Sequence, residues 1–197
     1  MNIGIYIYDE AEVLDFSGPF EVFTTASRVC DEDIKPFEVF LISEIGNEVT
    51  ARAGYKVISN YSLQNHPKID ILIVVGGVHT HELEKPEVIE WIALQSKKVS
   101  MVASVCTGAF LLAKANVLKN HKVTTHWEDI DDLHKMFPEL NIVKNLRWVD
   151  EGNIITSGGI SAGIDMSLHL VSKLHSVSLA EKTAKQMEFL WLKNTKT

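Results

Sequence analysis

Short runs of consecutive apolar residues alternate along this chain with longer segments whose apolar positions recur every three or four residues. The short runs are typical of buried parallel strands, and the longer segments are typical of amphipathic helices. Strands are expected at 3–8, 37–43, 69–77 and 98–105, and helices at 18–29, 84–97, 108–115, 127–137, 161–174 and 179–192. This alternation predicts an α/β fold in which helices cover both faces of a mostly parallel sheet.

Three other segments have less regular patterns. Residues 48–59 are polar, rich in β-branched side chains and interrupted by a glycine, which predicts a hairpin or an excursion at the sheet edge. Residues 122–126 predict a short strand. Residues 147–159 predict a hairpin or strand pair around the turn-forming sequence "DEGN".

Length and charge narrow the class of protein. The 197 residues are 46% hydrophobic and contain no long flexible linker, so we expect one domain over 1–197 that has no transmembrane segment. A formal net charge of −7 argues against nucleic acid as a partner of this chain by itself. The apolar N-terminus meets Asp9 and Glu10 too early for a signal peptide, and the two cysteines form no C-x-x-C pair. We therefore expect a cytoplasmic protein.

The segment "ASVCTGAF", residues 103–110, places Cys106 in a tight turn between a predicted strand and a predicted helix. This arrangement is similar to a nucleophile elbow, with sulfur in place of hydroxyl. Backbone N–H groups at the start of the helix favour a thiolate, whereas a nearby Asp15 carboxylate would oppose it unless protonated. We expect the donors to prevail or the carboxyl to hold the proton, which predicts an acidic, easily oxidised thiol. The alternative is a packing role, because free cysteines are commonly buried. Cys30 has no such surroundings and is interpreted as structural.

Two further strand-to-helix junctions carry groups that suit a cysteine nucleophile. In a parallel sheet these junctions open on one edge, so Asp15, residues 76–81 and Cys106 are expected to converge. Asp15 is a candidate proton partner, although an N-cap role is equally compatible with its position. The backbone N–H groups after Gly76 and Gly77 are candidate donors for developing negative charge.

Histidines near these junctions are further candidates. His126 follows Cys106 closely enough to reach it if the intervening helix folds back, and we assign it to substrate binding together with Val78 and His79. A surface or core role is the alternative for each histidine. His79 and His81 form an H-x-H pair, but no third ligand with suitable spacing accompanies it, so we expect no metal. The sequence has neither a dinucleotide fingerprint nor a phosphate loop, and we expect no cofactor.

Five ordered motifs resemble the ThiJ/PfpI superfamily across nearly the whole chain: "LDFSGPFEVF", "VVGG", "SVCTGAFLLAKANVL", "KVTTHW" and "TSGGISAGIDMSLHLV". The resemblance implies a flavodoxin-like, doubly wound fold of the class I glutamine amidotransferase type. It also implies a cysteine on an elbow after a central strand, paired with an acidic residue from the first junction, in a homodimer.

Two departures separate this chain from some branches of that superfamily. The deglycase and glyoxalase-like branch has a glutamate where this sequence has Val13, and a protease-like branch has a histidine where this sequence has Thr107. "LDFSGP", "VCTG" and "TTHW" are most similar to isonitrile hydratases, and equally similar to the sensor domains of AraC-type regulators. Those regulators continue into a DNA-binding region, and we expect none here because the terminal helices belong to the superfamily fold.

The resemblance supports two main hypotheses, each with a small molecule as partner. In the first, Cys106 attacks an isonitrile, Asp15 supplies a proton and Thr107 contacts Asp15 or the substrate. In the second, the same pocket senses a small molecule or an oxidant without turnover, with Cys106 as the oxidisable thiol. Glyoxalase or deglycase-like activity is a further alternative.

Overall fold

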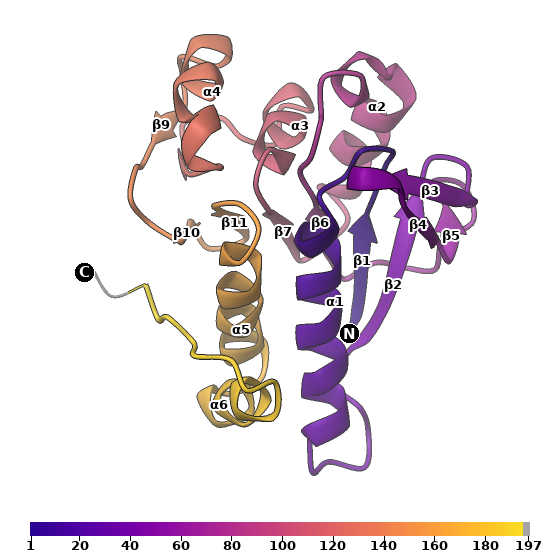
Figure 1. Ribbon diagram of the computed structural model, residues 1–197, viewed down its shortest axis with the longest axis vertical. Helices are drawn as coiled ribbons and strands as arrows, with labels where there is room; N and C mark the ends of the chain where they lie inside the picture. The colour runs from indigo at the N-terminus through magenta and orange to yellow at the C-terminus, as the bar shows by residue number, and fades with distance from the viewer. Residues whose placement is uncertain (195–197) are drawn as a thin grey trace.

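A computed structural model describes residues 1–194, so the last three residues of the predicted domain 1–197 lie outside the described part. Its main sheet has seven strands in the order β10-β11-β7-β6-β1-β2-β5 (Figure 1). All neighbouring strands pair in parallel except β10 and β11, which are antiparallel. The strands are β1 (Asn2–Tyr6), β2 (Glu38–Ser43), β5 (Tyr61–Ser62), β6 (Ile71–Val74), β7 (Met101–Ser104), β10 (Trp148–Asp150) and β11 (Ile154–Ser157).

Helices flank this sheet in two groups. Helices α1, α5 and α6 contact one another, and Figure 1 shows α1 and α5 running side by side, whereas α2 contacts α3. The helices are α1 (Val13–Val29), α2 (Pro86–Gln95), α3 (Gly108–Lys114), α4 (Ile130–Met136), α5 (Ala162–Leu174) and α6 (Val177–Gln186). Short 3₁₀ turns occupy Arg52–Gly54, Glu82–Glu84 and Trp127–Asp129. The predicted flavodoxin-like α/β fold is confirmed.

Two small sheets lie outside the main one. Strands β3 (Glu48–Ala51) and β4 (Tyr55–Ile58) form an antiparallel hairpin, as the pattern of residues 48–59 predicts. Strand β8 (Lys122–Val123) has only two residues and pairs in parallel with β9 (Asn141–Ile142), which the sequence pattern did not predict. A two-residue strand has too few positions to show alternation, which is why β9 gives no sequence signal.

The strand order creates a switch point between β1 and β6. From β1 the chain moves outward to β2 on one side, whereas β6, β7 and β11 build the sheet on the other side. In sheets of this kind ligands bind in the crevice beyond the carboxyl ends of the strands, where the order reverses. The junctions after β1, β6 and β7 carry Asp15, Gly76 and Cys106, so the fold brings the candidate residues to this crevice.

Two helix boundaries differ from the prediction by five residues or more. Helix α1 begins at Val13, five residues earlier than expected, so Asp15 lies in its first turn and Pro19 lies in its interior. Helix α6 ends at Gln186 and residues 187–194 do not continue it. The reason for the second difference is tertiary: the Trp191 indole and the Leu192 N–H donate to the backbone and carboxyl oxygens of buried Asp165, at 3.2 and 2.8 Å.

The central strands form a core that is closed on both faces. Every residue of β6 and β7 is buried, which matches the continuous apolar runs that predicted them. Within residues 1–194, none of the helices has the length and apolar character that crossing a membrane requires.

Candidate active site

Cys106 occupies a sharp turn between β7 and α3. Its backbone has a φ of 55°, a left-handed conformation that costs free energy for a residue with a side chain. The turn is held from several sides: the Cys106 N–H lies 3.2 Å from the carbonyl oxygens of Ser157 and Gly158, and the Thr125 hydroxyl donates to the Cys106 carbonyl at 2.8 Å. At Gly108 a Cβ would lie 2.2 Å from the Val74 carbonyl oxygen, so only glycine allows α3 to start here.

Asp15 faces the sulfur from the first turn of α1 and is fully buried. One carboxyl oxygen accepts the Gly76 N–H at 3.2 Å, and the other accepts the Ile160 N–H at 2.9 Å. The Cys106 thiol lies close enough to this carboxyl for each group to shift the pKa of the other. The alternative interpretation of Asp15 as an N-cap is wrong, because Glu12 holds the N-cap position and the Asp15 carboxyl is directed to backbone groups of other loops.

Burial controls the charge of this pair. Loss of water raises the pKa of Asp15 from 3.8 to about 7, against the opposing effect of hydrogen bonds from Ile160, Cys106 and Gly76. Burial also raises the pKa of the Cys106 thiol, and the charge of Asp15 raises it further, although the Thr107 N–H opposes both effects. The expectation of an acidic thiol is therefore wrong: below pH 7 the pair is mainly neutral, with one proton on each group.

The N–H groups after β6 hold the site together. The Gly76 N–H donates to Asp15, the Gly77 N–H donates to the Thr107 hydroxyl at 2.9 Å, and the Val78 N–H donates to the Glu10 carbonyl at 3.1 Å. The Thr107 hydroxyl in turn donates to the Gly77 carbonyl at 3.0 Å. Both of these hydrogen bonds of Thr107 are therefore made with Gly77 and neither with Asp15. The expectation that Gly76 and Gly77 offer free donors to a substrate is not met, because these groups already have partners.

A cavity of about 340 Å³ opens onto the sulfur. Its lining comes from several segments that lie far apart in the sequence: Glu12, Arg52, Gly77, Cys106, Thr107, His126, Glu128, Asp129 and Ile160. Nδ1 of His126 lies 3.3 Å from an Asp129 carboxyl oxygen. A Cβ at Gly159 would lie 3.0 Å from the Cys106 sulfur and 2.4 Å from the His126 ring, so Gly159 lets the two side chains share this wall.

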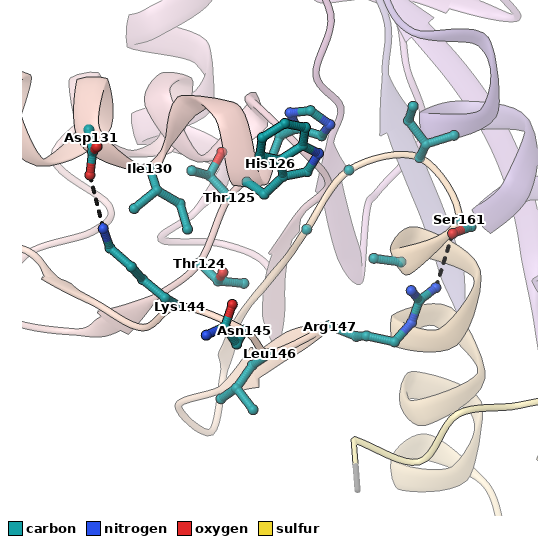
Figure 2. A pocket seen from close by; sticks show the side chains of 15 residues that line it. Thr124, Thr125, His126, Ile130, Asp131, Lys144, Asn145, Leu146, Arg147 and Ser161 are labelled. Carbon is teal, nitrogen blue, oxygen red and sulfur yellow. Dashed lines mark hydrogen bonds and ion pairs between the residues drawn. The ribbon is translucent and has the colours of Figure 1, made fainter. Parts of the chain in front are cut away.

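A larger cavity of about 710 Å³ adjoins the first one and shares His126 and Ile160 with it. Figure 2 shows it between α4 and the first turn of α5, with Thr124 and Leu146 also on its walls. Two cationic side chains in its lining already have partners. Lys144 pairs with Asp131 at 3.0 Å, and Arg147 binds the buried Asp165 carboxylate and the Ser161 hydroxyl. This cavity is therefore mainly neutral in character.

The remaining predicted residues lie away from the sulfur cavity. The His79 ring packs on Phe110 with centroids 4.3 Å apart and lines a separate cavity, and burial lowers its pKa. His81 and Val78 are exposed, and neither lines the sulfur cavity. Within residues 1–194, one group of three metal-ligating side chains has clustered ligand atoms: Cys30, Glu32 and His175. His79 and His81 do not belong to this group.

The family follows from comparison with known proteins. The model of the DJ-1/PfpI family matches residues 1–173. The chain belongs to the DJ-1/PfpI family. Among its DJ-1/PfpI relatives of known structure, a ThiJ/PfpI family protein from Pseudomonas syringae has a TM-score of 0.83 at 24% identity, over 95% of this chain and 74% of that one. This likeness shows the shared fold.

The curated relatives include both an enzyme and transcriptional regulators. Isonitrile hydratase of Pseudomonas putida is 30% identical over 191 residues, which cover 96% of this chain and 78% of that protein. The HTH-type transcriptional regulator CdhR of Pseudomonas aeruginosa is 32% identical over 174 residues, which cover 88% of this chain and 51% of the regulator. This DJ-1/PfpI chain thus spans about half the length of the regulators it matches.

Five residues of this DJ-1/PfpI site were missed in the sequence: Glu12, Arg52, Glu128, Asp129 and Ile160. Ile160 supplies an N–H to Asp15 from a loop with a φ of 57°, and "SGGI" just before a helix is the signal that marks it. The Glu12 carboxylate lies 3.9 Å from the Arg52 guanidinium in the cavity lining, to which Glu128 and Asp129 add two further carboxylates. Arg52 gives no sequence signal, because it comes from the turn between β3 and β4, remote from every strand-to-helix junction.

Proposed function

We propose that this protein is a cysteine-dependent enzyme that hydrates an isonitrile to an N-substituted formamide. The observation that carries the proposal is the buried pair of Cys106 and Asp15, in which the Cys106 side chain lines a cavity and the Asp15 carboxyl lies behind it. Addition to an isonitrile needs a proton for the terminal carbon and a nucleophile at the same carbon. A carboxylic acid beside a thiol supplies both groups. The similarity to isonitrile hydratase gives independent support.

The first step adds the S–H group across the isonitrile carbon. The neutral Asp15 acid gives its proton to that carbon, which carries a lone pair, and the Cys106 sulfur forms a bond to the same atom. The thiol proton then passes to the Asp15 carboxylate, which restores the acid. The product is a thioimidate, R–N=CH–S–Cys106, and the pair has the same protonation as before. A protonated Asp15 suits this step, and burial keeps it protonated up to about pH 7.

The second step uses water. Protonation of the nitrogen by Asp15 and attack of water on the carbon give a tetrahedral adduct, R–NH–CH(OH)–S–Cys106, as the water proton returns to Asp15. Breakage of the C–S bond then releases R–NH–CHO and restores the thiol. The sum is one isonitrile and one water converted to one formamide. His126 and Asp129 lie in the cavity lining, where they are placed to orient the attacking water.

The two cavities suggest where each part of the substrate binds. The isonitrile group is short and linear, which fits the smaller cavity above the sulfur. The substituent on nitrogen would then extend past His126 and Ile160 into the larger cavity. Because the cations there already pair with carboxylates, we propose that neutral or weakly polar substituents are preferred over anionic ones.

The test is a turnover screen with alkyl and aryl isonitriles, in which formamide is detected by mass spectrometry. Cys106→Ser is the matched control, since it keeps the size of the side chain and removes the sulfur. The proposal predicts formamide with wild type and none above the uncatalysed rate with Cys106→Ser. Equal rates for the two proteins would contradict it. Methylglyoxal and glyoxal in the same screen test the glyoxalase or deglycase-like alternative.

A sensing module is the second candidate function, and the similarity to regulators favours it. In that case the cavity binds a small molecule, or Cys106 is oxidised, without conversion of the ligand. A compound that raises the melting temperature of wild type and remains chemically unchanged after long incubation would support sensing. Formamide produced in many-fold excess over protein would reject it.

A further inference from the structure

Away from the sulfur cavity, the end of α1 meets the turn between α5 and α6. Cys30 ends α1 and is buried, Glu32 follows it in the loop, and His175 ends α5. His175 Nε2 lies 3.9 Å from the Cys30 sulfur and 3.0 Å from a Glu32 carboxyl oxygen, and all three ligand atoms lie within 4.8 Å of one another. We propose that these three side chains form a binding site for a divalent transition-metal ion of the Zn²⁺ class.

The spacing of the three atoms is close to that of a tetrahedral site. Zn–S bonds of about 2.3 Å and Zn–N bonds of about 2.0–2.1 Å place sulfur and nitrogen roughly 3.5 Å apart at a tetrahedral angle. The observed 3.9 Å between Cys30 and His175 differs from this by a few tenths of an ångström, which rotation of the side chains supplies. A shift of similar size opens the 3.0 Å separation between His175 and Glu32 to accept an ion.

The surroundings orient the histidine for this role. His175 Nδ1 lies 3.1 Å from the Ser176 hydroxyl, which also accepts the Leu179 N–H as the N-cap of α6. A hydroxyl oxygen has two lone pairs, so it accepts a proton from Nδ1 as well. In the metal-bound protein this tautomer directs the lone pair of Nε2 at the ion, which replaces the hydrogen bond that Nε2–H donates to Glu32 in the metal-free structure. Fixing the second ring nitrogen in this way is the usual support for a metal-binding histidine.

Ligand type and charge select the class of ion. Thiolate and imidazole favour zinc and similar transition metals over Mg²⁺ or Ca²⁺, which prefer oxygen. A Cys30 thiolate and the Glu32 carboxylate together balance a charge of +2. The Glu32 and His175 side chains are 62% and 24% exposed, so water has access to the fourth position. Binding releases the Cys30 proton and ties α1 to the α5–α6 turn.

Cobalt titration tests the site, because Co²⁺ bound to a thiolate absorbs in the near ultraviolet. Cys106→Ser is the parent protein, since it leaves Cys30 as its one cysteine. We expect a sulfur-to-cobalt band that saturates at one equivalent per chain and is displaced by Zn²⁺. The band should disappear when Cys30→Ser is added. Affinity should fall at least about tenfold with His175→Ala or Glu32→Gln and stay unchanged with His134→Ala, an exposed histidine elsewhere.

Either of two outcomes would overturn the proposal. One is the absence of a sulfur band at excess Co²⁺, and the other is a band that is indifferent to His175→Ala and Glu32→Gln. Glu32 is exposed, so Glu32→Gln keeps the test decisive even where another variant folds poorly. Zn²⁺ should also raise the melting temperature of the Cys106→Ser protein and leave that of the double Cys variant unchanged, because an ion that binds only the folded state stabilises it.

Discussion

Cys106 and Asp15 influence each other's protonation, because the charge of Asp15 raises the pKa of the thiol and the thiol lowers the pKa of the carboxyl. Substitution of one residue at a time distinguishes the role of Cys106 from that of Asp15. Cys106→Ala should abolish isonitrile turnover, since the covalent intermediate needs the sulfur. Asp15→Asn should lower kcat about a hundredfold or more, because an amide cannot cycle a proton. Steady-state kinetics on both variants measures this, and near-wild-type turnover in Asp15→Asn would remove Asp15 from the mechanism.

Asp15→Asn should also reduce stability. The two carboxyl oxygens accept separate N–H groups from Gly76 and Ile160, and an asparagine has only one oxygen to offer. Its NH₂ group would face a buried N–H donor, which costs about 1–3 kcal/mol. Urea unfolding at pH 6 measures the loss, with Asp131→Asn as an exposed control. Unchanged stability would mean that the loops adjust to the amide.

The pH dependence follows from the same carboxyl. Unfolded Asp15 ionises near 3.8 and folded Asp15 near 7, so the folded protein holds a proton that the unfolded chain releases. The contribution of Asp15 to stability is therefore largest below about pH 4 and is lost as the pH rises to about 7. Asp15→Asn should flatten the profile of unfolding free energy across this range, and a profile parallel to wild type would contradict the raised pKa.

Activity should follow the acid form of Asp15. Turnover through the neutral pair is expected to decline as the pH rises through about 7, because the carboxyl loses the proton that it gives to the isonitrile carbon. The pH profile of kcat/KM at fixed ionic strength tests this. A rate that rises steadily to pH 9 would show instead that a free Cys106 thiolate is the reactive species.

The loop between β11 and α5 packs against both Cys106 and His126 through Gly159. A Cβ at Gly159 would lie 2.4 Å from the His126 ring, whereas a Cβ at Gly158 meets nothing closer than the Ala162 Cβ at 3.4 Å. Gly159→Ala should destabilise the protein by about 1–3 kcal/mol through overpacking and change the rate of Cys106 alkylation. Gly158→Ala, the matched control, should do neither, and equal effects of the two substitutions would refute this packing argument.

Assembly is the prediction for the whole molecule. Family resemblance implies a homodimer, and we expect light scattering to give twice the 22.1 kDa mass of one chain at micromolar concentration. Trp127 lines the larger cavity and is 75% exposed in the single chain, so if the dimer covers this region, its dissociation on dilution would change the Trp127 fluorescence. A mass of one chain across the concentration range would contradict the prediction.

The sequence by itself determined the fold class and singled out Cys106 as the candidate nucleophile. Apolar runs such as 69–77 and 98–105 predicted the central strands because both faces of those strands are buried, and Cys106 stood out because the junction after a buried strand is identifiable from local pattern. Asp15 and Cys106 were expected to meet because parallel strands direct their carboxyl ends to one edge. These inferences depend on periodicity and connection rules, which a linear sequence contains.

Only the tertiary structure decided the protonation and the partners of the site. Burial by distant segments raises the pKa of both groups, which reversed the expected acidic thiol. Contacts between remote loops gave Asp15 the Ile160 N–H and gave the cavity Arg52. The Cys30, Glu32 and His175 cluster arises because α1 packs against the α5–α6 turn. Desolvation and long-range hydrogen bonds depend on three-dimensional neighbours, and local sequence pattern carries no record of them.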